Sequence, residues 1–433
     1  MLRRLFLVIA LAFGASNVFA EGFAVNVQGN KQVGMGHTGV ALNWDASSLQ
    51  FNPGALATMP MNFSVTAGTS ITLITNNFKG YGKDIDSELT PKTPFYFYAA
   101  GKVSDKLALG IGAYSPYGNS LDWGKDWPGK YLVQDISLSA IYIQPTVSYR
   151  ITDNFSIGGG PIIALGSFEL NRAVPQQIVN PANPTSPVVL PDGSIELSGS
   201  AVEFGFNVGM YYQKDRFSAG ISYRSEVKVN VEGDSKAQVD PQFVGFLQQA
   251  GQVNPQAMGT YLVLNSDELE TELPLAGTLN LGLAYRFGDR WTVAADVNYV
   301  FWDAYKNLTF TFTNSQNANQ PAVPLTTPKD WKNSLTYRIG AEYKANDRLD
   351  LRAGFYYDET PTRADKYTPE TPGANKIGLS AGASFKLTDR LSADASLLYI
   401  QGEKRKASSP DGKFAGEYQN TGFLPGFGLS YSF

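Results

Sequence analysis

Hydrophobic and polar residues alternate with a period of two along most of the chain, from about residue 61 to the C-terminus. The pattern is clearest at residues 291–301, 335–344 and 391–399, where apolar side chains share one face and polar side chains the other. Successive side chains of a β-strand point to opposite sides, so this alternation predicts half-buried strands. We therefore expect residues 60–433 to form one long series of strands.

Residues 21–59 do not follow this pattern. They are polar and rich in glycine, and they end in a turn-rich run from Asp45 to Gly54. A compact irregular segment ahead of a continuous series of strands predicts a plug, or hatch, inside a closed sheet. A wide barrel without such a plug would be open to solvent.

Short polar turns divide the strands and allow them to be counted. Six such turns alternate with seven long connections rich in proline, asparagine and glycine; the short turns lie at residues 103–106, 152–154, 214–216, 288–290, 346–348 and 388–390. With both ends of the chain on the side of the short turns, this arrangement predicts fourteen strands, an even number as in bacterial barrels. The stretch 136–150 changes its apolar face around Tyr142, which predicts a bulge there.

The apolar faces of these strands could point inward, as in a soluble sandwich, or outward to lipid. Small and charged residues fill the polar faces of many successive strands, and Tyr, Phe or Trp recurs at strand ends, as in the interfacial girdles of membrane barrels. The sequence therefore predicts an all-β, transmembrane antiparallel β-barrel. Its last strand alternates up to Phe433, which is typical of strands read by the barrel-assembly machinery, although a plain edge strand could end in the same way.

Composition narrows the class further. Residues 1–20 have the basic start, apolar core and small-residue cleavage site of a signal peptide, so we expect an exported chain. The absence of cysteine excludes disulfides and thiolate metal sites. A net charge of −4 without a basic stripe argues against nucleic-acid binding. After residue 20 no apolar run is long enough for a membrane helix, and nothing indicates a cofactor or a metal.

Four motifs resemble those of the FadL long-chain fatty-acid outer-membrane transporters. They are the hatch end with Asn52-Pro53-Gly54, the segment 110–118, Tyr223 to Lys228, and Arg352 to Pro361. The resemblance covers essentially the whole chain after residue 20. One departure is visible, because Gly54 stands where the family usually has alanine, and we expect it to loosen that turn slightly.

The resemblance implies a fourteen-stranded barrel that passes a hydrophobic ligand sideways into the membrane through a kink in the third strand. It implies hatch residues that act as a gate; these are Glu21, Gly22, Phe23, Asn52, Pro53 and Gly54. The predicted kink lies at Gly112, Ser115, Pro116, Tyr117 and Gly118. A proline cannot donate to a sheet ladder, which favours a break, although the strand could instead end before Pro116.

Two further sets of residues are candidate ligand contacts. Arg172 and Lys332 match positions where the family places basic pocket residues, and an arginine can bind a carboxylate with two hydrogen bonds. Either residue could instead be a charge at the strand top that faces water or lipopolysaccharide. Residues 240–251 predict an amphipathic helix whose stripe could line a capture groove or pack under loop 171–197; the stripe is Phe243, Phe246, Leu247 and Ala250.

These features predict passive uptake of long-chain fatty acids or related hydrophobic molecules by a monomer in contact with outer-membrane lipid and lipopolysaccharide. A channel of the same fold for hydrocarbons or aromatic compounds is one alternative, and a surface adhesin that transports nothing is another. Catalysis is not expected, because His37 is the only histidine and no partner acid is indicated.

Overall fold

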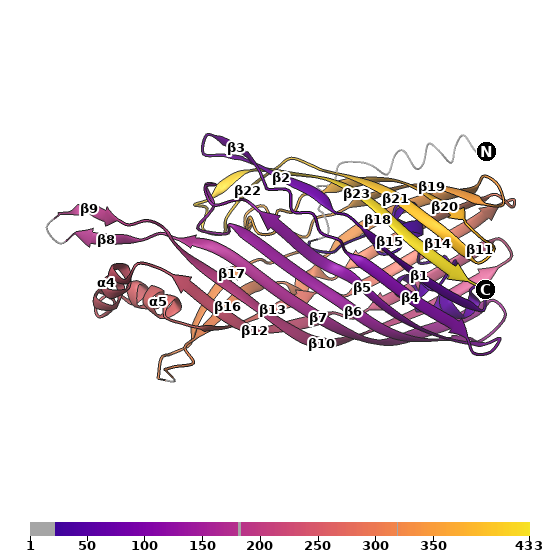
Figure 1. Ribbon diagram of the computed structural model, residues 1–433, viewed down its shortest axis with the longest axis horizontal. Coiled ribbons are helices and arrows are strands. Elements are labelled where there is room, and N and C mark those ends of the chain that lie inside the picture. Colours follow the sequence, from indigo (N-terminus) through magenta and orange to yellow (C-terminus); the bar gives the residue numbers. More distant parts are fainter. Residues whose placement is uncertain (1–21, 181–182, 318) are drawn as a thin grey trace.

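The computed structural model describes residues 22–180, 183–317 and 319–433, and the predicted signal peptide and Glu21 lie outside these residues. An antiparallel sheet closes into a barrel (Figure 1), because β1 (Phe63–Ser70) pairs with both β4 (Phe95–Lys102) and β23 (Ala415–Ser432). Counted over the described residues, 14 strands form the wall, which confirms the number predicted from the turns.

Several of these strands consist of two pieces separated by an irregularity, and short hairpins extend beyond the wall. In chain order the remaining strands are β2 (Leu73–Gly80), β3 (Lys83–Asp86), β5 (Leu107–Asp122), β6 (Asp135–Arg150), β7 (Phe155–Val174), β8 (Gln177–Asn180), β9 (Asn183–Val189), β10 (Gly193–Lys214), β11 (Phe217–Arg224), β12 (Val227–Gln238), β13 (Glu268–Leu275), β14 (Thr278–Phe287), β15 (Trp291–Val300), β16 (Asn307–Thr313), β17 (Val323–Pro328), β18 (Ser334–Lys344), β19 (Leu349–Asp358), β20 (Lys376–Lys386), β21 (Leu391–Gly402) and β22 (Arg405–Ser408).

The two ends of the barrel differ. The hairpin β8–β9 and the helices α4 (Pro241–Gly251) and α5 (Pro255–Leu264) project from the end opposite the C-terminus (Figure 1). None of the helices in the described part of the chain combines the length and the apolarity that a membrane-crossing helix needs. We call the end from which these elements project the loop end, and the end that carries the short turns and the C-terminus the turn end.

The outer surface carries the apolar face of the strands. Along β10, every second side chain from Val202 to Met210 is apolar and between 44% and 70% exposed. The same outward alternation runs through β23, where Phe427, Leu429 and Tyr431 are exposed. This surface is the apolar band that a barrel presents to lipid.

The interior has an apolar zone near the loop end and a polar zone near the turn end. On β6 the even-numbered side chains face inward; they change from Ile136, Ala140 and Tyr142 to Gln144, Thr146 and Ser148. The pairing of β6 with β7 keeps one register across this change. A register shift does lie next to Tyr142, in the pairing of β6 with β5, but the extra residue belongs to β5 and not to β6 as predicted. The face of β6 changes because the bore itself changes from apolar to polar.

Residues 22–59 form a separate segment inside the barrel, which we call the inner segment. It contains α2 (Asn30–Val33), α3 (Ser48–Phe51) and the 3-10 helix η1 (Pro53–Thr58). Helix α2 contacts β20 and β21, whereas η1 contacts β6, β7 and β10 on another side of the wall. Most residues of the segment are buried and the others are half-buried, so it occupies the bore between these walls.

Candidate functional site

Strand β5 changes register halfway along its length. Its pairing with β6 shifts between Tyr114 and Tyr117, where Ser115 and Pro116 together oppose one residue, Ile141. Pro116 has no N–H to donate, which suits an irregular position in a sheet. The strand continues to Asp122, so it does not end before the proline.

Beyond this shift, the inner segment takes the place of a neighbouring strand. β4 pairs with β5 only as far as Tyr114, and Ala24 then forms an antiparallel bridge with Tyr117. The amide of Val25 donates to the Pro116 carbonyl at 2.9 Å, and the amide of Gly118 donates to the Phe23 carbonyl at 3.0 Å. The inner segment is thus hydrogen-bonded along the irregular part of β5.

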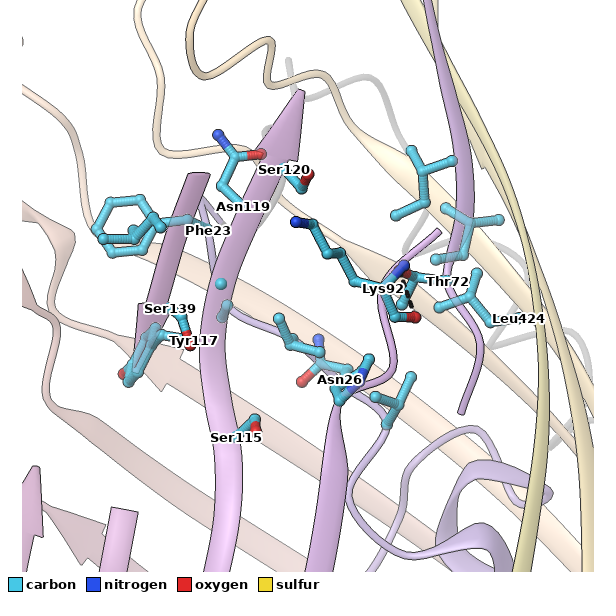
Figure 2. A pocket seen from close by; sticks show the side chains of 18 of the residues that line it. Phe23, Asn26, Thr72, Lys92, Ser115, Tyr117, Asn119, Ser120, Ser139 and Leu424 are labelled. Carbon is cyan, nitrogen blue, oxygen red and sulfur yellow. Dashed lines mark hydrogen bonds between the residues drawn. The ribbon is translucent and has the colours of Figure 1, made fainter. Parts of the chain in front are cut away.

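A cavity of about 460 Å³, which we call the lateral cavity, lies between this contact and β2. Its apolar lining includes Val25 and Val27 of the inner segment and Ile74, Phe95, Leu138 and Leu424 of the wall. Figure 2 shows the Lys92 side chain extending from the side of Thr72 toward Ser120 across this space. The cavity lies where the wall lacks a continuous ladder between β2 and β5.

The start of the inner segment is held by aromatic rings. The ring centroid of Phe23 lies 4.8 Å from that of Trp302, 5.7 Å from Trp331, 6.1 Å from Tyr117 and 6.2 Å from Tyr305. We call these four partners the aromatic box. A Cβ atom on Gly22 would come within 2.5 Å of Trp331, so only glycine fits ahead of Phe23.

The other end of the segment is anchored by Asn52, Pro53 and Gly54. The Asn52 side-chain amide donates to the carbonyls of Val40 and Met210 at 2.9 Å each. The carbonyl of Gly54 accepts a hydrogen bond from the Ser156 hydroxyl at 2.6 Å. A Cβ atom on Gly54 would lie 2.9 Å from the carbonyl oxygen of Gly209, so the glycine permits a close backbone contact with β10.

Charged side chains fix the middle of the segment. The carboxylate of Asp296 accepts the amides of Gly39 and Val40 at 2.7 and 3.1 Å. Within the segment, Lys31 pairs with Asp45 at 2.7 Å. Burial by itself would raise the pKa of Asp45, but the charge of the Lys31 ammonium and the hydrogen bonds from Lys31 and Ser47 together hold that pKa below its usual value.

His37 lies in the same region and its ring is buried against Phe51, with 4.9 Å between the ring centroids. Burial, reinforced by the positive charge of Arg338, holds the pKa of His37 well below 6.5. The backbone carbonyl of His37 accepts a hydrogen bond from Arg338 at 3.4 Å. A neutral imidazole packed against Phe51 is therefore part of the packing of the inner segment, and the backbone carbonyl of His37 joins it to the barrel wall.

The residues predicted to bind a carboxylate lie away from the lateral cavity. Arg172 is near the loop end of β7, opposite Ile195 of β10, and Lys332 is exposed with its backbone amide donating to the Pro361 carbonyl. Neither residue lines the lateral cavity. Their role as ligand contacts stays a prediction.

Helix α4 is capped by Asp240, and its apolar stripe faces its neighbours. Phe243 and Leu247 are buried, while Phe246 and Ala250 are half-buried against α5 and β8. This arrangement agrees with packing under loop 171–197. A role of the stripe in ligand capture stays a prediction.

Sequence reasoning missed the aromatic box. The run from Tyr299 to Tyr305 contains four aromatic residues and interrupts a strand pattern, and Trp331 follows a further break. This concentration of aromatic residues at breaks in the strand pattern is the sequence feature that could have indicated the aromatic box. The same reasoning overlooked Lys329 and Glu370, which are far apart in sequence and contact each other near the box.

Comparison with known proteins identifies the family. A family profile described as "Outer membrane protein transport protein (OMPP1/FadL/TodX)" matches residues 11–433. A long-chain fatty acid transport protein of Escherichia coli O6:H1 is 24% identical, covering 99% of this chain and 97% of that protein. Outer membrane protein P1 of Haemophilus influenzae is 23% identical, covering 91% and 87% of the two chains.

Solved structures have the same fold. A Pseudomonas aeruginosa FadL homologue superposes with a TM-score of 0.82 at 18% identity, covering 95% of this chain and all, 100%, of that one. The Pseudomonas putida toluene transporter TodX gives a TM-score of 0.69 at 16% identity, covering 96% and 99%. Together with the match to the family profile, which spans the sequence from residue 11 to its end, these similarities show that the chain is an outer-membrane β-barrel and belongs to the OMPP1/FadL/TodX family of outer membrane transport proteins.

Proposed function

We propose that this barrel takes up long-chain fatty acids or related hydrophobic molecules by passive diffusion and releases them sideways into the outer membrane. The observation that carries this proposal is the lateral cavity, which adjoins the register shift of β5 and is lined by apolar side chains of the inner segment and the wall together with polar ones. A ligand leaving there avoids the polar zone at the turn end. The names of the relatives, which describe transport proteins, support the same reading.

The inner segment is the gate in this proposal. Its residues Phe23 to Val25 occupy the aromatic box and the edge of β5, so a ligand that enters the box must displace Phe23. Displacement removes the two backbone hydrogen bonds to Pro116 and Gly118 and widens the lateral cavity. The Asn52 anchor, more than twenty residues away, keeps the rest of the segment in the bore during this movement.

A channel for monoaromatic hydrocarbons is the second candidate. The aromatic box favours it, because flat rings pack well against tryptophan and tyrosine in edge-to-face geometry. Structural similarity to a toluene transporter supports the shared fold and does not choose between the two ligand classes.

The test is uptake by cells that lack their own transporters of this family and express the full chain. Radiolabelled oleate and toluene are offered separately, and uptake is compared with that of cells carrying an empty vector. The proposal expects oleate uptake above the vector control. Uptake of toluene alone would favour the hydrocarbon channel, and uptake of neither would contradict transport.

A further inference from the structure

A second, smaller cavity lies in the bore behind the start of the inner segment. It has a volume of about 60 Å³, and we call it the polar chamber. Ala24, Val25 and Asn26 line this chamber as well as the lateral cavity, so these three residues separate the two spaces. Pro116 and Tyr117, at the register shift of β5, also line the chamber. The polar chamber therefore adjoins both partners of the contact between the inner segment and β5.

The lining of the polar chamber carries positive charge. Arg224, at the end of β11, and Arg338, in β18, are its two permanently charged residues. The other polar side chains are amides, a hydroxyl and the neutral imidazole of His37. Among the described residues that line the chamber there is no aspartate or glutamate.

One of the two arginines has a carboxylate close by, and the other does not. Arg338 stands opposite Asp296 in the ladder between β15 and β18, and its charge acts on that carboxylate. Arg224 forms no ion pair within the part of the chain that the structure describes. Its guanidinium donates to the Gln50 carbonyl at 2.9 Å and lies 5.7 Å from the centroid of the Tyr114 ring. Neither contact supplies a negative charge.

An unbalanced guanidinium inside the barrel favours a counter-ion. A buried charge loses its solvation by water, and a carbonyl group or an aromatic ring replaces only part of that solvation. Water in the chamber solvates Arg224 and leaves its charge unbalanced. A small anion balances the charge and accepts hydrogen bonds from the N–H groups of the guanidinium.

The size of the chamber restricts the kind of anion. One water molecule needs about 10–15 Å³ of such a cavity, so the chamber has room for only a few groups of that size. Chloride and bromide fit this space, whereas gluconate, a sugar acid with many more atoms, does not. A ligand in the lateral cavity cannot reach the chamber while residues 24–26 separate the two spaces.

We propose that the polar chamber binds a small monovalent anion of the size of chloride, and that this ion holds residues 24–28 of the inner segment against β5. The ion pairs with Arg224, whose guanidinium also donates to the Gln50 carbonyl of the inner segment. Without the ion, release of residues 24–26 opens the chamber and lets solvent reach Arg224, so the closed position is less favoured. The ion acts on the resting position of the inner segment whatever the barrel transports, so its binding does not rest on the proposed transport function.

Bromide locates the site directly. Crystals of the folded protein, grown without halide, are soaked in sodium bromide, and the ion is identified by its anomalous scattering. We expect a peak in the polar chamber next to Arg224. Density for water in the chamber without an anomalous peak would overturn the proposal.

Hydrogen exchange shows whether the ion holds the segment. Exchange of the Val25 amide, which donates to the Pro116 carbonyl, is compared in sodium chloride and in sodium gluconate at the same pH and ionic strength. We expect the protection factor to be at least about tenfold lower in gluconate, as for the loss of a hydrogen bond to a charged group. The Ala57 amide, which donates to the Ser148 hydroxyl away from the chamber, should keep its protection. Equal protection of Val25 in the two salts would contradict the role of the ion.

The variant Arg224→Gln removes the charge that the ion balances and keeps a side-chain amide that can donate to Gln50. It should abolish both the bromide peak and the difference between the two salts. The control is Arg286→Gln, because the Arg286 guanidinium also donates to a backbone carbonyl, that of Asp215 at 2.8 Å, but is exposed at the turn end. This control should keep the peak and the difference. Folding is checked by the heat-dependent mobility of the barrel in gels, and if Arg224→Gln does not fold, the two experiments on wild type decide.

The remaining outcomes are also distinct. A bromide peak without an effect on exchange would mark an adventitious ion only and would overturn the role of the ion in holding the segment. A difference between the salts that persists in Arg224→Gln would place the ion elsewhere and overturn this site. Absence of hydrophobe uptake by cells would count against the proposed function and would leave the anion site standing.

Discussion

At the scale of single residues, the contacts of the inner segment depend on groups that tolerate no added atoms or charge. Gly22 and Gly54 each lie where a Cβ atom would meet a neighbouring ring or carbonyl at less than 3.0 Å. In the sequence, both glycines stand out only as members of motifs. The predicted loosening of a turn at Gly54 does not account for the close contact that this residue makes with β10. Such close approaches arise from the folded wall and are not visible in local sequence.

Substituting Gly54 should weaken the anchor of the inner segment. In Gly54→Ala, the new Cβ atom lies 2.9 Å from the Gly209 carbonyl oxygen, so the backbone of η1 or β10 must shift. Overpacking of this kind costs about 1–3 kcal/mol. Chemical denaturation of the folded barrel measures the loss, and an unchanged free energy of unfolding in Gly54→Ala would count against the close contact.

The inner segment should become less stable in acid because of His37. Its pKa is lower in the folded protein than in the unfolded chain, so the unfolded state binds more protons and the contribution of neutral His37 is lost as pH falls below about 6.5. Each pH unit below that value costs about 1.4 kcal/mol until the folded-state pKa is reached.

Hydrogen exchange of residues 22–59 at pH 7.5 and pH 5 measures this effect. His37 has a positive φ of 63°, so asparagine, which accepts that conformation, is the suitable replacement. After correction for the slower intrinsic exchange in acid, we expect lower protection factors at pH 5 than at pH 7.5 in wild type, and a smaller pH effect in His37→Asn. The same pH effect in both proteins would assign the acid sensitivity to other groups.

At the scale of elements, the strands and short turns were predictable and the shape of the bore was not. Alternation and Asp-containing turns are local signals, and they gave the strand number and the positions of all six turns. The face change on β6 indicates a bulge in that strand only if the bore is polar throughout, which it is not. Its apolar loop end becomes visible only when several strands are assembled side by side.

The register shift of β5 should matter for transport and not for folding. Deleting Pro116 removes the extra residue opposite Ile141 and allows regular pairing with β6. Uptake of a hydrophobic ligand should then fall to background while the folded barrel persists in gels. Pro161→Thr, at a position of β7 paired in regular register with Phe206, is the control and should keep its uptake. If uptake is undiminished after deletion of Pro116, the irregular part of β5 is not the exit for the ligand.

At the scale of the whole molecule, the candidate site joins distant parts of the chain. The aromatic box unites Tyr117, Trp302, Tyr305 and Trp331 around Phe23, and the Lys329–Glu370 pair lies beside it. The resemblance to the FadL family identified the inner segment and the β5 kink as places to examine. It could not supply this cluster, because only closure of the barrel brings residues near 20, 117, 302 and 331 together.

The central claim is that the inner segment must leave β5 before a ligand passes, and a reversible cross-link tests it most directly. The chain has no cysteine, and Ala24 and Tyr117 are directly opposite each other in an antiparallel bridge, which suits a disulfide. The double variant Ala24→Cys and Tyr117→Cys is assayed for oleate uptake before and after reduction, so that the same protein is its own control. We predict uptake at background when oxidised and restored by reductant; equal uptake in the two states would contradict the account.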